Sequence, residues 1–223
     1  MIKKSLLICA TVPLIFVASA AFAEGGDSGF NIGISGGSTK ANLSEGDLNA
    51  LLRSQNYVSP SSSVKNTDTA YRISGGYRFS PIFSLEAHYT DLGKYSSESR
   101  ATLVPNAGAG TLSAKYKTSG FGIDALVSAP LGTGFSIYGR VGVMRAKTEA
   151  NFTSSGSIFV SPTSRLNATA NTTAYSYGIG AQYDINKQIG IRVEGQRYDK
   201  LGNNDTGGKL KLDVYTIGAV FSF

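Results

Sequence analysis

The C-terminal stretch Lys209–Phe223, KLKLDVYTIGAVFSF, decides how this chain folds. From Tyr215 onward, bulky apolar side chains alternate with smaller ones, and this period of two predicts a β-strand. A strand with a bulky apolar face that ends on an aromatic residue is typical of the closing strand of a transmembrane β-barrel, where aromatic side chains lie between lipid and water. The bulky face consists of Tyr215, Ile217, Ala219, Phe221 and Phe223.

The first 23 residues have the three parts of a secretory signal peptide. Two lysines are followed by an apolar run, Leu6–Val17, and then by a small-x-small cleavage site, Ala21–Ala23. The run is too short for a membrane helix. We therefore expect Sec-dependent export, removal of residues 1–23, and one outer membrane β-barrel domain over residues 24–223.

The composition excludes several classes of function. The sole cysteine, Cys9, lies in the signal peptide, so the mature chain has no disulfide or thiol chemistry. Of the 21 basic residues, Lys3 and Lys4 are removed with the signal, and the 19 that remain face 15 acidic residues. This mature net charge of +4 is too mild to predict nucleic-acid binding. One histidine without a cysteine makes no metal cluster, and we expect neither a metal nor another cofactor.

Period-two alternation recurs in eight segments of the mature chain. In each segment, bulky apolar side chains occupy one face, and glycine, serine and charged residues occupy the other. We predict an all-β fold, an eight-stranded antiparallel up-and-down transmembrane β-barrel. The predicted strands are Gly29–Ser38, Thr67–Phe79, Ile82–Leu92, Ser113–Ala129, Phe135–Glu149, Thr172–Ile185, Gln188–Tyr198 and Lys209–Phe223.

Short and long connections alternate between these strands, which predicts that all the long loops lie at one end. Outer membrane barrels have short periplasmic turns and long extracellular loops, so both mature termini are expected in the periplasm. A soluble lipocalin-like barrel is the alternative, but its charged residues would face outward. The expected turns cover residues 80–81, 130–134 and 186–187, and the expected loops cover residues 39–66, 93–112, 150–171 and 199–208.

The inward-facing positions carry charges of both signs. Eight strands leave an interior only wide enough for side chains, and buried charges are tolerated there only when they are paired. We predict a salt-bridge network that plugs the lumen. The alternative is a gated pathway for small ions, in which one ion pair, Glu86 with Arg192 or with Arg140, breaks and re-forms. The predicted network consists of Arg72, Arg78, Glu86, Asp124, Arg140, Arg192 and Glu194.

His88 is the single histidine, and an outer membrane enzyme could use it as a general base beside a hydroxyl group. Alternation places it in the lumen with Glu86 and Thr90, away from lipid substrates. We therefore predict a packed lumen histidine, no catalytic residues, and a protein that is not an enzyme.

Outward-facing cations gather near the loop ends of the later strands. Charges at the membrane interface cost only about 0–1 kcal/mol, and anionic head groups make such positions favourable. We hypothesise that these cations contact lipopolysaccharide phosphates, with an ordinary solvated rim as the alternative. Asp213, on the same face, is expected to pair with a rim cation. The candidates are Lys115, Lys117, Arg145, Lys147, Arg197, Lys209 and Lys211.

Three motifs resemble the OmpA-like transmembrane barrel family, and their order spans nearly the whole mature chain. Ser84–Lys94 (SLEAHYTDLGK) is similar to the family's third strand, Phe135–Met144 (FSIYGRVGVM) to its fifth, and Ala174–Glu194 (AYSYGIGAQYDINKQIGIRVE) to its sixth and seventh. The resemblance implies a lumen salt-bridge network that includes Glu86, Arg140, Arg192 and Glu194. It also implies insertion by the barrel assembly machinery, which reads the C-terminal strand through Tyr215, Ile217, Phe221 and Phe223.

Two positions depart from the family pattern. A lysine of the family's fourth strand corresponds to Leu126, and a glutamate of its sixth strand corresponds to Gln182. These departures weaken the hypothesis of a gate that exchanges ion-pair partners. The peptidoglycan-binding domain of many relatives is not expected here, so tethering to the cell wall is not the predicted role.

Three functions remain open from the sequence. The first is a structural, monomeric barrel whose loops, rich in Ser, Thr, Asn and Gly, meet host or environmental ligands, with lipids and lipopolysaccharide around the wall. The second is a low-conductance porin that uses the lumen charges. The third, and least favoured, is a lipid-modifying enzyme of the outer membrane.

Overall fold

The computed structural model describes residues 28–54, 56–103, 108–132, 134–156, 167–206 and 208–223. The expected signal peptide, residues 1–23, lies outside this part of the chain. The elements are β1 (Gly29–Ala41), α1 (Glu45–Ser54), β2 (Tyr57–Lys65), β3 (Thr67–Arg78), β4 (Phe83–Leu103), β5 (Ala109–Gly132), β6 (Phe135–Gly156), β7 (Asn167–Asp184), β8 (Ile189–Leu201), η1 (Asn204–Thr206) and β9 (Leu210–Ser222).

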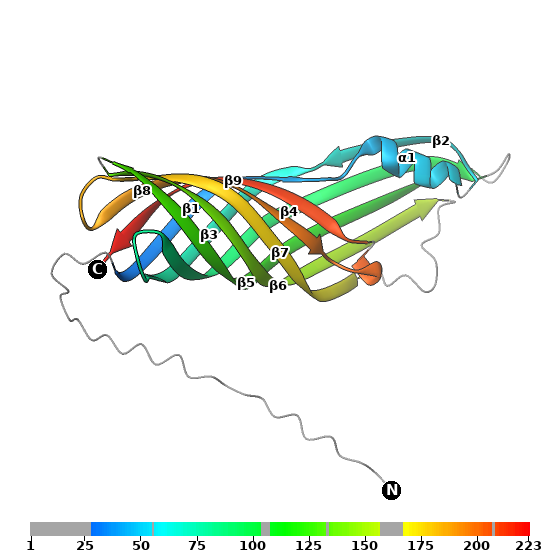
Figure 1. Ribbon diagram of the computed structural model, residues 1–223. Helices are drawn as coiled ribbons and strands as arrows, with labels where there is room; N and C mark the ends of the chain where they lie inside the picture. Colours follow the sequence, from blue (N-terminus) through cyan, green and yellow to red (C-terminus); the bar gives the residue numbers. More distant parts are fainter. Residues whose placement is uncertain (1–27, 55, 104–107, 133, 157–166, 207) are drawn as a thin grey trace, which may run out of the picture.

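Eight of the strands close into a ring, as predicted. Each strand of the ring pairs antiparallel with its neighbours, in the order β1, β3, β4, β5, β6, β7, β8 and β9, and β9 pairs back with β1 (Figure 1). Ile34 of β1 lies opposite Ile73 of β3 on one side and Ala219 of β9 on the other. The last predicted strand therefore closes the barrel against the first. Among the described residues, no helix is both long and apolar enough to span a membrane.

The first predicted loop, residues 39–66, contains structure that the sequence did not reveal. It includes α1 and β2, and β2 pairs with Ser96–Leu103 of β4, on the edge of β4 that β3 occupies nearer the periplasmic end. The Glu45 carboxylate at the start of α1 accepts a hydrogen bond from the backbone N–H of Val64 in β2 at 3.3 Å. The sequence of β2, YVSPSSSVK, is rich in serine, and Val58, Pro60 and Val64 in one phase are too weak a pattern for period-two alternation to predict a strand.

The wall of the barrel is much longer than the membrane requires. β5 has 24 residues, whereas about 9–11 residues suffice for a transmembrane strand. The prediction of loops over residues 93–112 and 150–171 was wrong for most of the residues that the structure describes there, because these segments continue β4, β5, β6 and β7. Figure 1 shows this extension at the end that carries α1 and β2, opposite the C-terminus.

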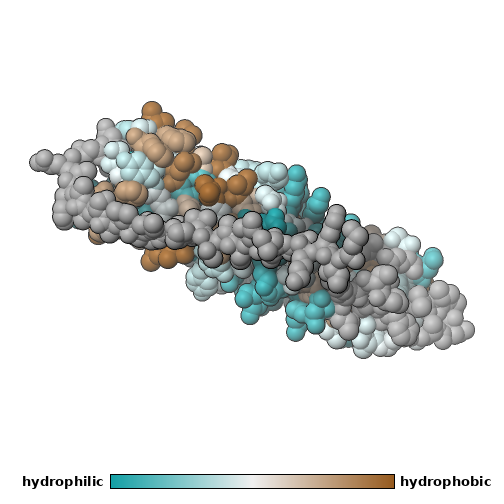
Figure 2. Space-filling model, turned by 90° about the horizontal axis from the view of Figure 1, so that it is seen from below, coloured by the Kyte–Doolittle hydropathy of each residue, from teal (hydrophilic) through white to brown (hydrophobic). Residues whose placement is uncertain are grey.

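The outer surface has an apolar band with aromatic residues at both edges, as expected for a wall surrounded by lipid. At the edge near the chain ends, the rings of Phe30 and Tyr77 lie 4.8 Å apart. At the opposite edge, Tyr89 and Phe121 also lie 4.8 Å apart. Figure 2 shows apolar side chains gathered over one half of the molecule and hydrophilic ones towards the other.

β4 changes phase in its middle. Residues up to Leu92 face the lumen at even numbers, and residues from Tyr95 onward face it at odd numbers. A β-bulge before Lys94 makes this change, and Gly93 supplies the positive φ of 86°. The Asp68 carboxylate accepts a hydrogen bond from the Lys94 backbone N–H at 2.6 Å, and this bond lowers the pKa of Asp68. The bulge thus places Lys94 outside the wall and Tyr95 inside.

Glycines on the inner face leave room for large side chains from other strands. A Cβ atom added to Gly142 would overlap the Asp124 carboxylate, and one added to Gly180 would overlap the Tyr138 ring. The outward-facing Gly139 lies on the same strand as Gly142, but a Cβ atom there meets nothing within 4 Å. The inner glycines are therefore a steric requirement of the filled lumen.

We expect Gly142→Ala to lower the free energy of unfolding by about 1–3 kcal/mol, because the added methyl group overpacks the lumen beside Asp124. The matched outer variant, Gly139→Ala, should change it by no more than about 0.5–1 kcal/mol, in the stabilising direction. Urea unfolding of both variants in detergent micelles measures the difference. Equal effects of the two substitutions would contradict the steric account.

Candidate functional sites in the lumen and on the outer face

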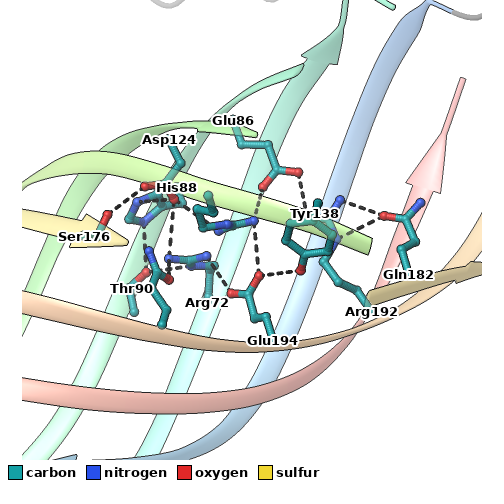
Figure 3. Close-up of polar contacts among 12 residues, drawn as sticks. Arg72, Glu86, His88, Thr90, Asp124, Tyr138, Ser176, Gln182, Arg192 and Glu194 are labelled. Carbon is teal, nitrogen blue, oxygen red and sulfur yellow. Dashed lines mark hydrogen bonds and ion pairs between the residues drawn. The ribbon is translucent and has the colours of Figure 1, made fainter. Parts of the chain in front are cut away.

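Arg140 is the centre of a buried ionic layer at mid-height of the lumen. Its Nη2 lies 2.7 Å from Glu86 Oε2 and 3.3 Å from Glu194 Oε2, and its Nη1 lies 3.1 Å from Asp124 Oδ2. Three carboxylates from three different strands thus converge on one guanidinium (Figure 3).

Two further arginines complete the layer. Arg192 Nη1 lies 2.7 Å from Glu86 Oε1, and its remaining nitrogens donate to Gln182 Oε1 at 3.1 and 2.9 Å. Arg72 Nη1 lies 2.9 Å from Glu194 Oε1, and its Nη2 donates to Gln196 at 2.6 Å. The layer therefore contains three guanidinium groups and three carboxylates, so its formal charges cancel.

The structure brings six of the seven predicted network residues together and leaves out one. Arg78 makes no ion pair with any described residue, which corrects its assignment to the network. It lies nearer the periplasmic turns, beside a chamber at that mouth of the barrel, while Glu86 is already held by Arg140 and Arg192. Alternation gave its inward direction but not its depth relative to the carboxylates.

Leu126 and Gln182, the two departures from the family pattern, both lie inside the lumen. Leu126 is buried, and Gln182 accepts from Arg192 and donates from Nε2 to Asp184 at 2.6 Å. Neither side chain carries a charge that could take a partner from Glu86.

His88 lies in an arrangement that resembles a catalytic triad. Its Nδ1 is 2.9 Å from the Thr90 hydroxyl and its Nε2 is 3.2 Å from Asp124 Oδ2. All three side chains are buried, however, and Asp124 is also held by Arg140 and by the Ser176 hydroxyl at 2.9 Å. The geometry gives a substrate no access, and the arrangement is part of the lumen packing.

An apolar layer lies above the ionic layer, towards the extended end of the barrel. The Tyr95 hydroxyl donates to the Thr39 hydroxyl at 2.6 Å and contacts the carbonyl of Leu92, so this polar group has partners inside the apolar layer. The sequence analysis missed this layer, although Met144 and Leu212 stand in the inward phase of two predicted strands. Its largest members, all fully buried, are Leu92, Tyr95, Met144, Tyr198, Leu201 and Leu212.

The seven predicted rim cations all lie exposed on the outer face, but three of them have carboxylate partners. Arg197 binds Asp213 at 2.5 and 2.8 Å, so Asp213 has the rim cation that was expected for it. Lys147 lies 2.6 Å from Glu149, and Lys211 lies 3.4 Å from Asp199. The other four, Lys115, Lys117, Arg145 and Lys209, make no ion pair with a described residue.

Lys94 is an outward cation that the sequence analysis missed, because the predicted third strand ended at Leu92. It lies directly opposite Lys117 in the β4–β5 ladder, and like charges in such positions destabilise a sheet. We call Lys94, Lys115, Lys117, Arg145 and Lys147 the outer cationic patch. With the neighbouring carboxylates Asp91 and Glu149, this face has an excess of three positive charges.

The residues of the expected assembly signal lie on the outward face of β9 and, in the case of Phe223, directly after its last residue. Tyr215, Ile217, Phe221 and Phe223 are all exposed, and the rings of Phe221 and Phe223 lie 4.9 Å apart.

A closed ring of strands with an apolar outer band and a charged, filled interior defines an integral outer membrane β-barrel. The chain belongs to the outer membrane protein beta-barrel domain family, which it matches over residues 9–223. Its place is accordingly the outer membrane of a Gram-negative cell. No curated protein matches the chain.

Solved structures of small outer membrane barrels are similar to it. Neisserial surface protein A has 13% sequence identity and a TM-score of 0.55, covering 90% of this chain and 100% of that chain. The N-terminal barrel of Pseudomonas aeruginosa OprF has 14% identity and a TM-score of 0.47, and Yersinia pestis Ail has 14% identity and a TM-score of 0.46. Both comparisons also cover 90% of this chain and 100% of the other. At these identities the likeness describes the fold and not the role.

We expect Glu86→Gln to destabilise the barrel by about 3–5 kcal/mol, because Arg140 and Arg192 lose their shared buried carboxylate. Glu98→Gln is the matched control, since it breaks an exposed pair with Arg100 at 3.0 Å, worth about 0–1 kcal/mol. Urea unfolding in micelles compares the two. A Glu86→Gln barrel as stable as the Glu98→Gln barrel would show that the ionic layer does not hold the lumen together.

Proposed function

We propose that the protein is a non-enzymatic outer membrane barrel with a closed lumen, which presents an extended β-sheet above the membrane and contacts lipopolysaccharide through its outer cationic patch. The observation that supports this proposal most directly is the closed lumen. A balanced ionic layer and a buried apolar layer lie one above the other, so the interior has no room for a solute at either level.

The extension of the barrel above the membrane provides the surface that other molecules can contact. The extension is formed by β2, β4, β5, β6 and β7, and it reaches well beyond the upper aromatic edge of the band, where Tyr89 and Phe121 lie. Leu52 of α1 packs with Ala101 of β4 on its inner side. Its outer face is rich in serine, threonine, asparagine and charged residues, which suits contact with host or environmental molecules.

The outer cationic patch has the position and charge expected of a lipopolysaccharide contact. Arg145 lies opposite Phe121, which belongs to the upper aromatic edge, so the patch begins at the level of lipid head groups. Phosphates between Lys94 and Lys117 would offset the repulsion of this like-charged pair. Glu149, opposite Lys117 in the β5–β6 ladder, offsets this repulsion only in part, because it also pairs with Lys147, and the remaining positive charge favours lipopolysaccharide over a merely solvated rim.

Two further expectations belong to this proposal. The outward aromatic face of β9 serves as the signal read by the barrel assembly machinery during insertion, and the inserted barrel acts as a monomer. The porin and enzyme alternatives are less favoured, because the charges of the ionic layer are all paired and His88 is enclosed.

We expect the double variant Lys94→Gln/Lys117→Gln to lose most of the lipopolysaccharide that co-purifies with the barrel, because the phosphates lose two of their cations. In detergent free of lipopolysaccharide, the stability of the same variant should change by less than about 0.5 kcal/mol, because the lost repulsion between Lys94 and Lys117 is offset by the lost attraction between Lys117 and Glu149, which lie opposite each other in the β5–β6 ladder. Lipid A quantification per barrel and thermal melting measure the two effects.

The control variant, Arg53→Gln/Lys187→Gln, removes two charges from α1 and from a periplasmic turn. Its lipopolysaccharide content should equal that of the wild type. Undiminished lipopolysaccharide on the Lys94/Lys117 variant would contradict the proposed contact.

A further inference from the structure

A polar chamber of about 220 Å³ lies at the periplasmic mouth of the barrel, below the ionic layer. The turn residues Pro81 and Pro130 line its outer side, and Tyr138, Gln182 and Arg192 of the ionic layer line its inner side. A single water molecule needs only about 10–15 Å³, so the chamber has room for a polyatomic ligand.

The chamber contains one guanidinium group that the fold leaves unused. Arg78 is half-buried in its wall and makes no hydrogen bond or ion pair with any described residue, so its five N–H donors are free. The other lining cation, Arg192, already donates to Glu86 and Gln182. Asp184, the single carboxylate among the described lining residues, accepts from Gln182 at 2.6 Å.

Further polar groups around Arg78 also lack partners. Asn31 is only 5% exposed, yet its amide oxygen accepts no hydrogen bond from the described residues. Ser84 lies opposite Arg78 in the β3–β4 ladder. Its hydroxyl and those of Ser128 and Ser136, which also line the chamber, make no hydrogen bond within the described part of the chain. Buried polar groups are normally satisfied, so the buried amide oxygen of Asn31 requires an explanation, while Arg78 and the serine hydroxyls are open to the chamber.

We propose that this chamber binds inorganic phosphate from the periplasm. Arg78 and the serine hydroxyls donate to the charged phosphate oxygens. A protonated phosphate oxygen donates to the amide oxygen of Asn31. Sulfate has similar size and charge but is unprotonated at neutral pH, so it cannot make this last bond.

The test is a titration of the folded, isotope-labelled barrel in nonionic micelles with sodium phosphate and, separately, with sodium sulfate at equal ionic strength. We expect phosphate to shift the side-chain NMR signals of Arg78 and Asn31 saturably, with at least several-fold weaker binding of sulfate. Glycerol phosphate, a monoester that is mostly unprotonated at neutral pH, should bind no more tightly than sulfate.

Arg78→Gln should abolish the saturable shifts while the barrel stays folded, because Arg78 has no partner to lose. Arg53→Gln is the charge-matched control and should bind phosphate as the wild type does. Asn31→Ala should reduce phosphate affinity to that of sulfate, which keeps the test valid even if Arg78→Gln fails to fold.

Absence of saturable shifts, or undiminished binding by Arg78→Gln, would overturn the site. Equal affinity for phosphate and sulfate would overturn its assignment to a phosphate group. None of these results depends on the outer cationic patch, which lies at the other end of the barrel.

Discussion

The pairing of buried charge inside a narrow ring of strands is the constraint on which the rest of this structure depends. Each fully buried guanidinium in the lumen would be prohibitively costly without a carboxylate beside it. Arg140 meets this requirement by touching Glu86, Asp124 and Glu194 at once, while Arg192 binds the second oxygen of Glu86 and Arg72 that of Glu194. Because these side chains fill the lumen, Gly142 and Gly180 have no room for a side chain.

The two layers of the lumen reflect the two environments of the wall. Where lipid surrounds the barrel, the outer face is apolar and the inner face is polar, which reverses the arrangement of a soluble protein. Above the membrane, water surrounds the wall, so burial of apolar side chains becomes favourable. The cluster around Tyr95, Met144 and Leu212 therefore serves as a small core for the extension, and it also closes the lumen a second time.

The ring could be predicted from the sequence, because every transmembrane strand alternates in a way that lipid imposes. The extension could not, because strands with water outside need no apolar outer face, and β2 is mostly serine with few apolar residues in either phase. The inward direction of the network residues followed from the same alternation, but their depth did not, which is why Arg78 was misplaced. Lys94 was missed for another reason: the bulge at Gly93 reverses the phase of β4, and such a change is invisible to a search for strict alternation.

Two successive layers close the lumen, and single-channel recording tests this closure most directly. Wild-type barrel and Glu86→Gln barrel, both shown to be folded by their heat-modifiable migration on gels, would be inserted into planar lipid bilayers. The account predicts no discrete openings from either protein, since the apolar layer still closes the lumen when the ionic layer is weakened. Discrete openings whose size or frequency changes with Glu86→Gln would contradict it and show that the lumen charges line a conducting path.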